Sequence, residues 1–209
     1  MAADRIWAGV DVGGRRKGFH IAVIDDHRVL AVENRTSVPA AAAFLGAQHP
    51  RLVAIDSPCA LAAADGFRRE SERRLAAAVC RLRYTPTDAA LDAQKRKRRR
   101  ARARYYEWIE HGRELYEALE AAGLATIECF PTACWTEWYG RRDGDGRGVW
   151  SMAALMGLGI EASARHLGQD GRDAIAAALT AWQAEHGECR CFGDIVVPRQ
   201  RPTWQGVRR

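Results

Sequence analysis

The sequence has no long hydrophobic run, and its six cysteines show no paired C-x2-C spacing. A membrane-spanning helix needs roughly 18 successive apolar residues, and the opening residues MAADRIWAG lack the apolar core of a secretion signal. We therefore expect a cytoplasmic protein with no membrane partner. Its thiols are then expected to be reduced, and only Cys189-x-Cys191 comes near the spacing of a zinc motif.

The chain also lacks a P-loop, a complete EF-hand and an internal repeat. The acidic loop GRRDGDGRG has no glutamate at the EF-hand spacing, so calcium is not expected there. With 209 residues and 47% hydrophobic content, the chain is long enough to bury a proper core. We expect one domain over residues 1–209.

Positive charge is modest in total but concentrated in one segment. The net charge is +6, and the run KRKRRRARAR holds eight cations without an anion. Such a run is expected to contact the phosphates of DNA or RNA, although a solvated helix face is the alternative interpretation. The basic residues expected to contact nucleic acid are Arg15, Arg16, Lys17, Lys95, Arg96, Lys97, Arg98, Arg99, Arg100, Arg102 and Arg104.

Hydrophobic patterning predicts an α/β fold. Short apolar segments at 6–12, 18–24 and 29–33, separated by turns, predict an antiparallel three-strand meander. A helix at 39–48 and a strand at 51–56 follow. This order predicts a central mixed sheet, in which the meander is joined by parallel strands, with helices on both faces.

After Pro58 the pattern becomes helical and basic for about sixty residues, which predicts a helical insertion at about 59–123. The sequence LATIECF then predicts a strand. Two helices are expected later, at 149–168 and 171–187, and residues 199–209 are expected to be loose.

Four carboxylates follow this pattern. Asp11, Asp56 and Glu128 stand at or near strand ends, and Asp173 begins a late helix. Ligands of open α/β sheets bind beyond the carboxyl ends of the strands, and converging carboxylates bind hard cations such as Mg²⁺ or Mn²⁺. His20, on the second strand beside these carboxylates, could help to bind phosphate or substrate, but a lone strand histidine is more often structural.

Each carboxylate also has a structural interpretation. Asp11 could cap the amides of the following GGR turn, and Asp56 could cap a helix that starts at Pro58. Glu128 could face solvent at a sheet edge, and Asp173 could be a first-turn anion favoured by the helix dipole. The tryptophans of CWTEWYG are expected in the core rather than in a base-stacking platform.

The segments GVDVGGRRKGFHIAVI, VAIDSPCAL, RLRYTP, TIECFPTACW and GRDAIAAALTAW, in this order, resemble a family of unknown function described as predicted nucleases with an RNase H-like fold. The resemblance spans Ile6 to about Trp182. The sequence is also similar, more distantly, to the RuvC and YqgF resolvases. The resemblance implies a three-layer RNase H-like fold in which Asp11, Asp56, Glu128 and Asp173 are the catalytic, metal-binding set. The basic run matches no motif of that family.

Three functions remain open at this point. The first is a nuclease that uses Mg²⁺ or Mn²⁺ to hydrolyse phosphodiester bonds in DNA or RNA. The second is a nucleic-acid-binding protein of the same fold without catalysis. The third is an actin-like phosphotransferase, because GVDVGG resembles the first phosphate loop of those kinases, although a second copy of the loop is missing. The sequence leaves open whether the active unit is a homodimer.

Overall fold

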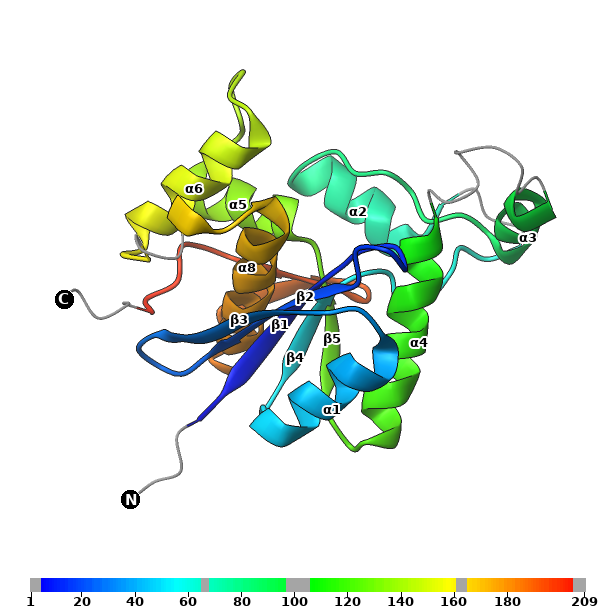
Figure 1. Cartoon of the computed structure of the whole chain (residues 1–209). Coiled ribbons are helices and arrows are strands. Elements are labelled where there is room, and N and C mark those ends of the chain that lie inside the picture. Colours follow the sequence, from blue (N-terminus) through cyan, green and yellow to red (C-terminus); the bar gives the residue numbers. More distant parts are fainter. Residues whose placement is uncertain (1–4, 65–67, 97–105, 161–164, 205–209) are drawn as a thin grey trace.

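The computed structural model describes residues 5–64, 68–96, 106–160 and 165–204, and a seven-stranded sheet runs through its centre. The strands are ordered β3-β2-β1-β4-β5-β7-β6 (Figure 1). Their bounds are β1 Trp7–Val12, β2 Phe19–Ile24, β3 Val29–Arg35, β4 Val53–Asp56, β5 Thr126–Cys129, β6 Cys189–Phe192 and β7 Ile195–Pro198.

The strand directions identify the fold class. β1, β2 and β3 form the predicted antiparallel meander, while β4, β5 and β7 run parallel to β1 and β6 is antiparallel to β7. A meander extended on one side by parallel strands, with helices on both faces, is the RNase H-like arrangement. The predicted three-layer fold is therefore confirmed.

Helices cover both faces of the sheet. Helices α1 and α4 pack together on one face, and α8 lies on the other with α5 and α6 beyond it (Figure 1). The bounds are α1 Val38–Gln48, α2 Glu70–Ala78, α3 Asp88–Arg96, α4 Glu107–Ala121, α5 Pro131–Tyr139, α6 Arg147–Gly157 and α8 Gln169–Glu185. Helices α2, α3 and α4 all lie between β4 and β5 in the sequence. No helix in the described part of the chain is long and apolar enough to cross a bilayer.

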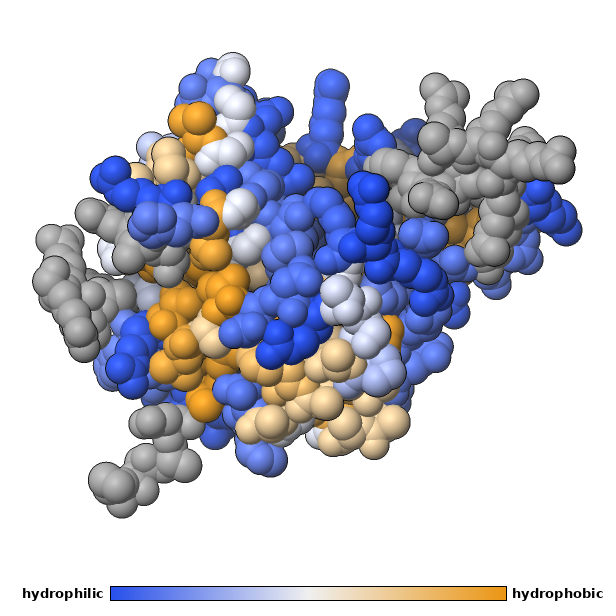
Figure 2. Space-filling view, in the orientation of Figure 1, coloured by the Kyte–Doolittle hydropathy of each residue, from blue (hydrophilic) through white to orange (hydrophobic). Residues whose placement is uncertain are grey.

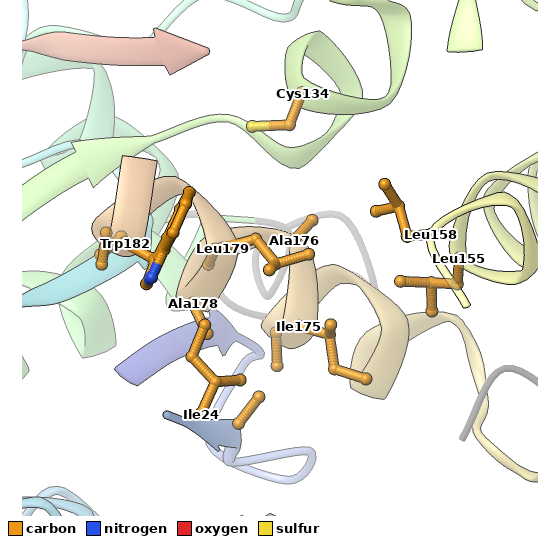
Figure 3. Close-up of a cluster of buried hydrophobic side chains, with 14 of the residues drawn as sticks. Ile24, Cys134, Leu155, Leu158, Ile175, Ala176, Ala178, Leu179 and Trp182 are labelled. Atoms are coloured by element: carbon orange, nitrogen blue, oxygen red, sulfur yellow. The ribbon is translucent and has the colours of Figure 1, made fainter. Parts of the chain in front are cut away.

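Helix α8 forms the centre of the larger core. Figure 3 shows Ile175, Leu179 and Trp182 along α8, with Ile24 of β2 and Leu155 of α6 on either side. The helix lies close to the sheet because β1 has a glycine beneath it. A Cβ atom added to Gly9 would lie 2.0 Å from the backbone nitrogen of Ala178. This close contact fixes the position of α8 over β1.

Two elements were not predicted from the sequence, and two predictions are wrong in detail. The unpredicted elements are the helix α5 directly after β5 and the β6–β7 hairpin. The helix expected at 149–168 ends at Gly157, because Gly159 adopts a positive φ of 81° shortly afterwards. The tail is not loose as far as Trp204, which is buried and donates a hydrogen bond to the Asp25 carbonyl.

Candidate metal and nucleic-acid site

Asp11 and Asp56 lie side by side at the carboxyl ends of β1 and β4. They are direct partners in the parallel register, so both side chains leave the sheet on the same face. Gly9, two residues before Asp11, contacts α8 and identifies that face as the one beneath α8. No helix begins at Pro58, so Asp56 is not a helix cap.

The two carboxyl groups are destabilised in their ionised form. Burial, followed by the charge of Asp56, holds the pKa of Asp11 well above its usual value. Burial raises the pKa of Asp56 to about 8, and the nearby Asp173 adds to this rise while Arg147 opposes it. Paired carboxylates with raised pKa values gain free energy when a cation neutralises them.

His20 and Asp170 complete a group around Asp11. His20 of β2 is the antiparallel partner of Asp11, and Asp170 lies in the first turn of α8. One potential ligand atom from each of Asp11, His20 and Asp170 lies within 4.8 Å of the other two. Burial lowers the pKa of His20, which favours the neutral imidazole that binds metals. Asp170 also accepts a hydrogen bond from Lys17 Nζ at 2.6 Å.

Asp173 lies one turn further along α8 and is almost completely enclosed. Its Oδ1 accepts hydrogen bonds from Trp135 Nε1 at 2.8 Å and Gln169 Nε2 at 2.9 Å, and its Oδ2 accepts one from Arg147 Nη2 at 2.9 Å. Burial raises the pKa of Asp173, and Arg147 lowers it. Because α8 begins at Gln169, Asp173 is beyond the first turn, and the helix-dipole interpretation does not apply.

Glu128 lies elsewhere. Its register partner on β4 is Ile55, so it leaves the sheet on the face opposite to Asp11 and Asp56. Arg69 donates to both Glu128 oxygens at 2.8 and 2.7 Å, and the Cys59 backbone nitrogen donates at 2.9 Å. The structure therefore directs Glu128 to the opposite face and pairs it with Arg69, although its charge still contributes to the raised pKa of Asp56. It is buried, so it does not face solvent at a sheet edge.

The predicted basic residues divide into two groups. Arg15 pairs with Glu114 at 2.5 Å on α4, whereas Arg16 and Lys17 are exposed in the turn after β1. Lys95 and Arg96 end α3, and Lys97, Arg98, Arg99, Arg100, Arg102 and Arg104 lie outside the described residues. Figure 2 shows hydrophilic side chains over the surface between α6 and the N-terminal end of α4.

Sequence reasoning missed Asp170 and Arg147. Asp170 was overlooked because the helix was expected to start at Gly171, which left Asp170 in a loop. Residues three apart on a helix share a face, so the spacing of Asp170 and Asp173 was the available signal. No local pattern marks Arg147, whose contact with Asp173 joins two helices distant in sequence.

The donor set fits a hard divalent cation. Mg²⁺ and Mn²⁺ prefer carboxylate oxygens, and an imidazole is compatible with Mn²⁺. The cluster also lies where open α/β sheets bind ligands. Asp11, Asp56, His20 and Asp170 could hold such an ion, while Lys17 and Arg147 supply positive charge at its border.

Residues 9–196 match the model of a protein family of unknown function, DUF429. No functionally curated protein matches the sequence. Among solved structures, the fold is similar to Thermus thermophilus RuvC, with a TM-score of 0.48 and 14% identity over 87% of this chain and 96% of that one. It is also similar to T. thermophilus RuvC in complex with a Holliday junction substrate, with a TM-score of 0.42 and 15% identity over 88% and 96%. The strand order, rather than these values, identifies the fold.

Proposed function

The chain belongs to the DUF429 family of unknown function, and we propose from its site that it is a divalent-metal-dependent nuclease acting on DNA or RNA. The observation that carries this proposal is the convergence of Asp11, Asp56, His20 and Asp170 at one end of the sheet. Among the described residues, Arg147 lowers the pKa values of Asp11 and Asp56 without cancelling the rise that burial and the neighbouring carboxylates cause.

In this proposal each residue has a distinct task. Asp11 of β1 and Asp56 of β4 would hold the ion together with Asp170 of α8 and His20 of β2. A bound Mg²⁺ or Mn²⁺ would supply Lewis-acid activation of water for phosphodiester hydrolysis. Arg147, about half exposed and anchored by Asp173, is positioned to contact a non-bridging phosphate oxygen. Lys17 is positioned similarly from the turn after β1.

Glu128 has a positioning role in this proposal. Its two oxygens fix Arg69 and the backbone at Cys59, three residues after Asp56. The segment that follows Asp56 is therefore anchored from the opposite face of the sheet. Glu128 holds this segment in place and does not bind the ion.

Calorimetric titration of Mn²⁺ and Mg²⁺ tests the metal site. Asp11→Asn should weaken binding at least about tenfold because it removes a ligand charge at the centre of the cluster. Asp88→Asn, at an exposed position on α3, is the matched control and should bind as the wild type does. The Asp11 variant should also lose metal-dependent cleavage of oligonucleotides. Unchanged metal binding in Asp11→Asn would contradict the assignment.

A non-catalytic nucleic-acid-binding protein is the second candidate. It is favoured by the environment of Asp173, a metal ligand expected from the sequence, because Trp135, Gln169 and Arg147 all donate hydrogen bonds to its oxygens. Nucleic-acid binding that persists in EDTA and in Asp11→Asn, without any cleavage by the wild type, would select this function.

A further inference from the structure

A cavity adjoins the carboxylate cluster on the α4 side of the sheet. It lies beyond the ends of β4 and β5, between α2, α4 and the segment 82–85, and Asp56 forms part of its wall. It holds about 480 Å³ of empty space, counting its open mouth. Much of this space is open to solvent, and only about 50 Å³ of it can hold the centre of a water-sized group. The enclosed part of the cavity is therefore small, and it suits one ring rather than a large ligand.

Aromatic and apolar side chains form most of its wall. The contributing residues include Pro58, Tyr84, Tyr106, Trp108 and Phe130. Tyr84 is held in place by Arg68, whose guanidinium lies 4.1 Å from the ring centroid and donates to its hydroxyl. Such walls favour a flat ring that can stack.

Two of the acidic groups at the cavity, Glu128 and Glu72, have partners within the protein. Arg69 and Cys59 donate to Glu128, and the Thr85 backbone nitrogen donates to Glu72 at 3.0 Å. The contact with Glu72 fixes the segment 82–85, and the contacts with Glu128 fix the chain at Cys59. The protein's own groups therefore hold this part of the cavity wall in place.

One polar atom at the cavity has no partner within the described residues. Ser57 is buried and lines the cavity, and its Oγ makes no hydrogen bond. Gly112 of α4 leaves room for this side chain, since a Cβ at that position would lie 2.0 Å from Ser57 Oγ. The hydroxyl is enclosed and packed against α4. A buried hydroxyl without a partner costs free energy, and rotation of the Ser57 side chain toward the cavity would let the hydrogen-bonding edge of a ligand remove this cost.

We propose that this cavity binds a nucleobase of the nucleic-acid substrate, at a nucleotide next to the cleaved phosphodiester. The inference rests on the proposed nuclease function, because Asp56 belongs to both the carboxylate cluster and the cavity wall. A nucleotide with its phosphate at the cluster would direct its base into the aromatic cavity, where Ser57 would contact the edge of the ring.

This placement defines a substrate class. A base in the cavity is unstacked and unpaired, and this costs least where the nucleotide is already single-stranded or mismatched. The preferred substrates are then single strands, or the unpaired positions of branched and looped structures. Fully paired duplexes should be poor substrates.

Calorimetry with nucleoside 5′-monophosphates and with ribose 5-phosphate tests the cavity directly, with and without Mg²⁺. In the wild type the base should raise the affinity at least about fivefold over ribose 5-phosphate. Tyr84→Leu should abolish this gain, and Tyr139→Leu, at an exposed tyrosine outside the cavity, should retain it. Equal affinities for nucleotide and ribose 5-phosphate, or a gain unchanged by Tyr84→Leu, would overturn the proposal.

This measurement requires no cleavage, so the base pocket and the nuclease activity can fail independently. For an oligonucleotide that the wild type cleaves, an abasic analogue on one side of the cut should lower kcat/KM at least about fivefold. If an abasic position leaves kcat/KM unchanged on both sides of the cut, the proposal is wrong. This second test uses only the wild-type protein and therefore stands even if Tyr84→Leu does not fold.

Discussion

At the scale of single residues, the carboxylates of the cluster lie close enough to repel one another when they are ionised. Asp11 and Asp56 are register partners on adjacent strands, and Asp173 adds a third negative charge nearby. Arg147 offsets part of this repulsion because its charge lowers the pKa of all three carboxyl groups. The site is therefore adapted to hold more positive charge than the protein itself supplies.

Asp56 makes stability depend on pH in the absence of metal. Its pKa is about 8 in the folded protein against 3.8 as the reference, so the folded state binds the proton more tightly. This contribution is complete below about pH 4 and is lost as the pH rises through 8, with a slope of up to about 1 kcal/mol per pH unit. Urea denaturation in EDTA between pH 5 and 8 should show wild-type stability falling.

Asp56→Asn removes this titrating group, so its stability should fall less over the same range. Mg²⁺ should also flatten the wild-type profile, because the ion binds the ionised carboxylates and displaces their protons. A wild-type stability that rises from pH 5 to pH 8 in EDTA would show that the carboxyl groups ionise without cost.

At the scale of elements, the contact between β1 and α8 sets the geometry of the site. Asp11 lies on β1, whereas Asp170 and Asp173 lie on α8. Gly9 brings the two elements together through backbone atoms, at 2.0 Å from a hypothetical Cβ to Ala178 N and 2.3 Å to Ala174 O. The distance from Asp11 on β1 to Asp170 and Asp173 on α8 therefore depends on Gly9, which has no side chain.

Gly9→Ala should destabilise the protein by about 1–3 kcal/mol, because the added methyl meets backbone and not a flexible side chain. It should also weaken Mn²⁺ binding by moving α8 away from β1. Gly46→Ala is the matched control on α1, where an added Cβ has no heavy atom within 4 Å. That change should be neutral or stabilising by up to about 1 kcal/mol. Equal denaturation midpoints for the two variants would refute this account.

The meander and β4 could be predicted because each has an apolar pattern bounded by turn residues. These segments also placed Asp11 and Asp56 at strand ends. The four-residue strands β6 and β7 carry too little pattern of their own and depend on the neighbouring edge of β5. The partners of Glu128 and Asp173 could not be predicted, because Arg69 and Arg147 reach them from helices whose packing is not encoded in local spacing.

At the scale of the whole molecule, the two ends of the sheet differ in charge arrangement. The carboxyl ends of the parallel strands carry the acidic cluster, with Arg16 and Lys17 nearby. Ion pairs occur at both ends, as in Arg5 with Asp26 at one end and Lys17 with Asp170 at the other. At the cluster end a bound cation would neutralise the carboxylates and leave the charges of Lys17 and Arg147 for phosphates, so we expect a polyanion to bind there.

Nucleic-acid affinity should fall steeply with salt. If Arg98, Arg99 and Arg100 each contact a phosphate, changing all three to glutamine should lower the slope of log K against log[salt] by about 2–3. Fluorescence anisotropy with a labelled oligonucleotide at several salt concentrations measures this slope. The same charge change at Arg5, Arg28 and Arg51 is the control and should leave the slope unaltered. An equal effect of both triple variants would mean that only net charge matters.

The bond from the Trp135 indole to Asp173 links the core to the proposed metal site. Trp135 is fully buried, and its Nε1 proton points at a carboxylate oxygen 2.8 Å away. An indole N–H of this kind gives a resolved NMR resonance whose chemical shift follows the strength of its hydrogen bond. The protein thus contains an intrinsic spectroscopic probe, through which ion loading and displacement of Arg147 can be followed without a label at the site itself.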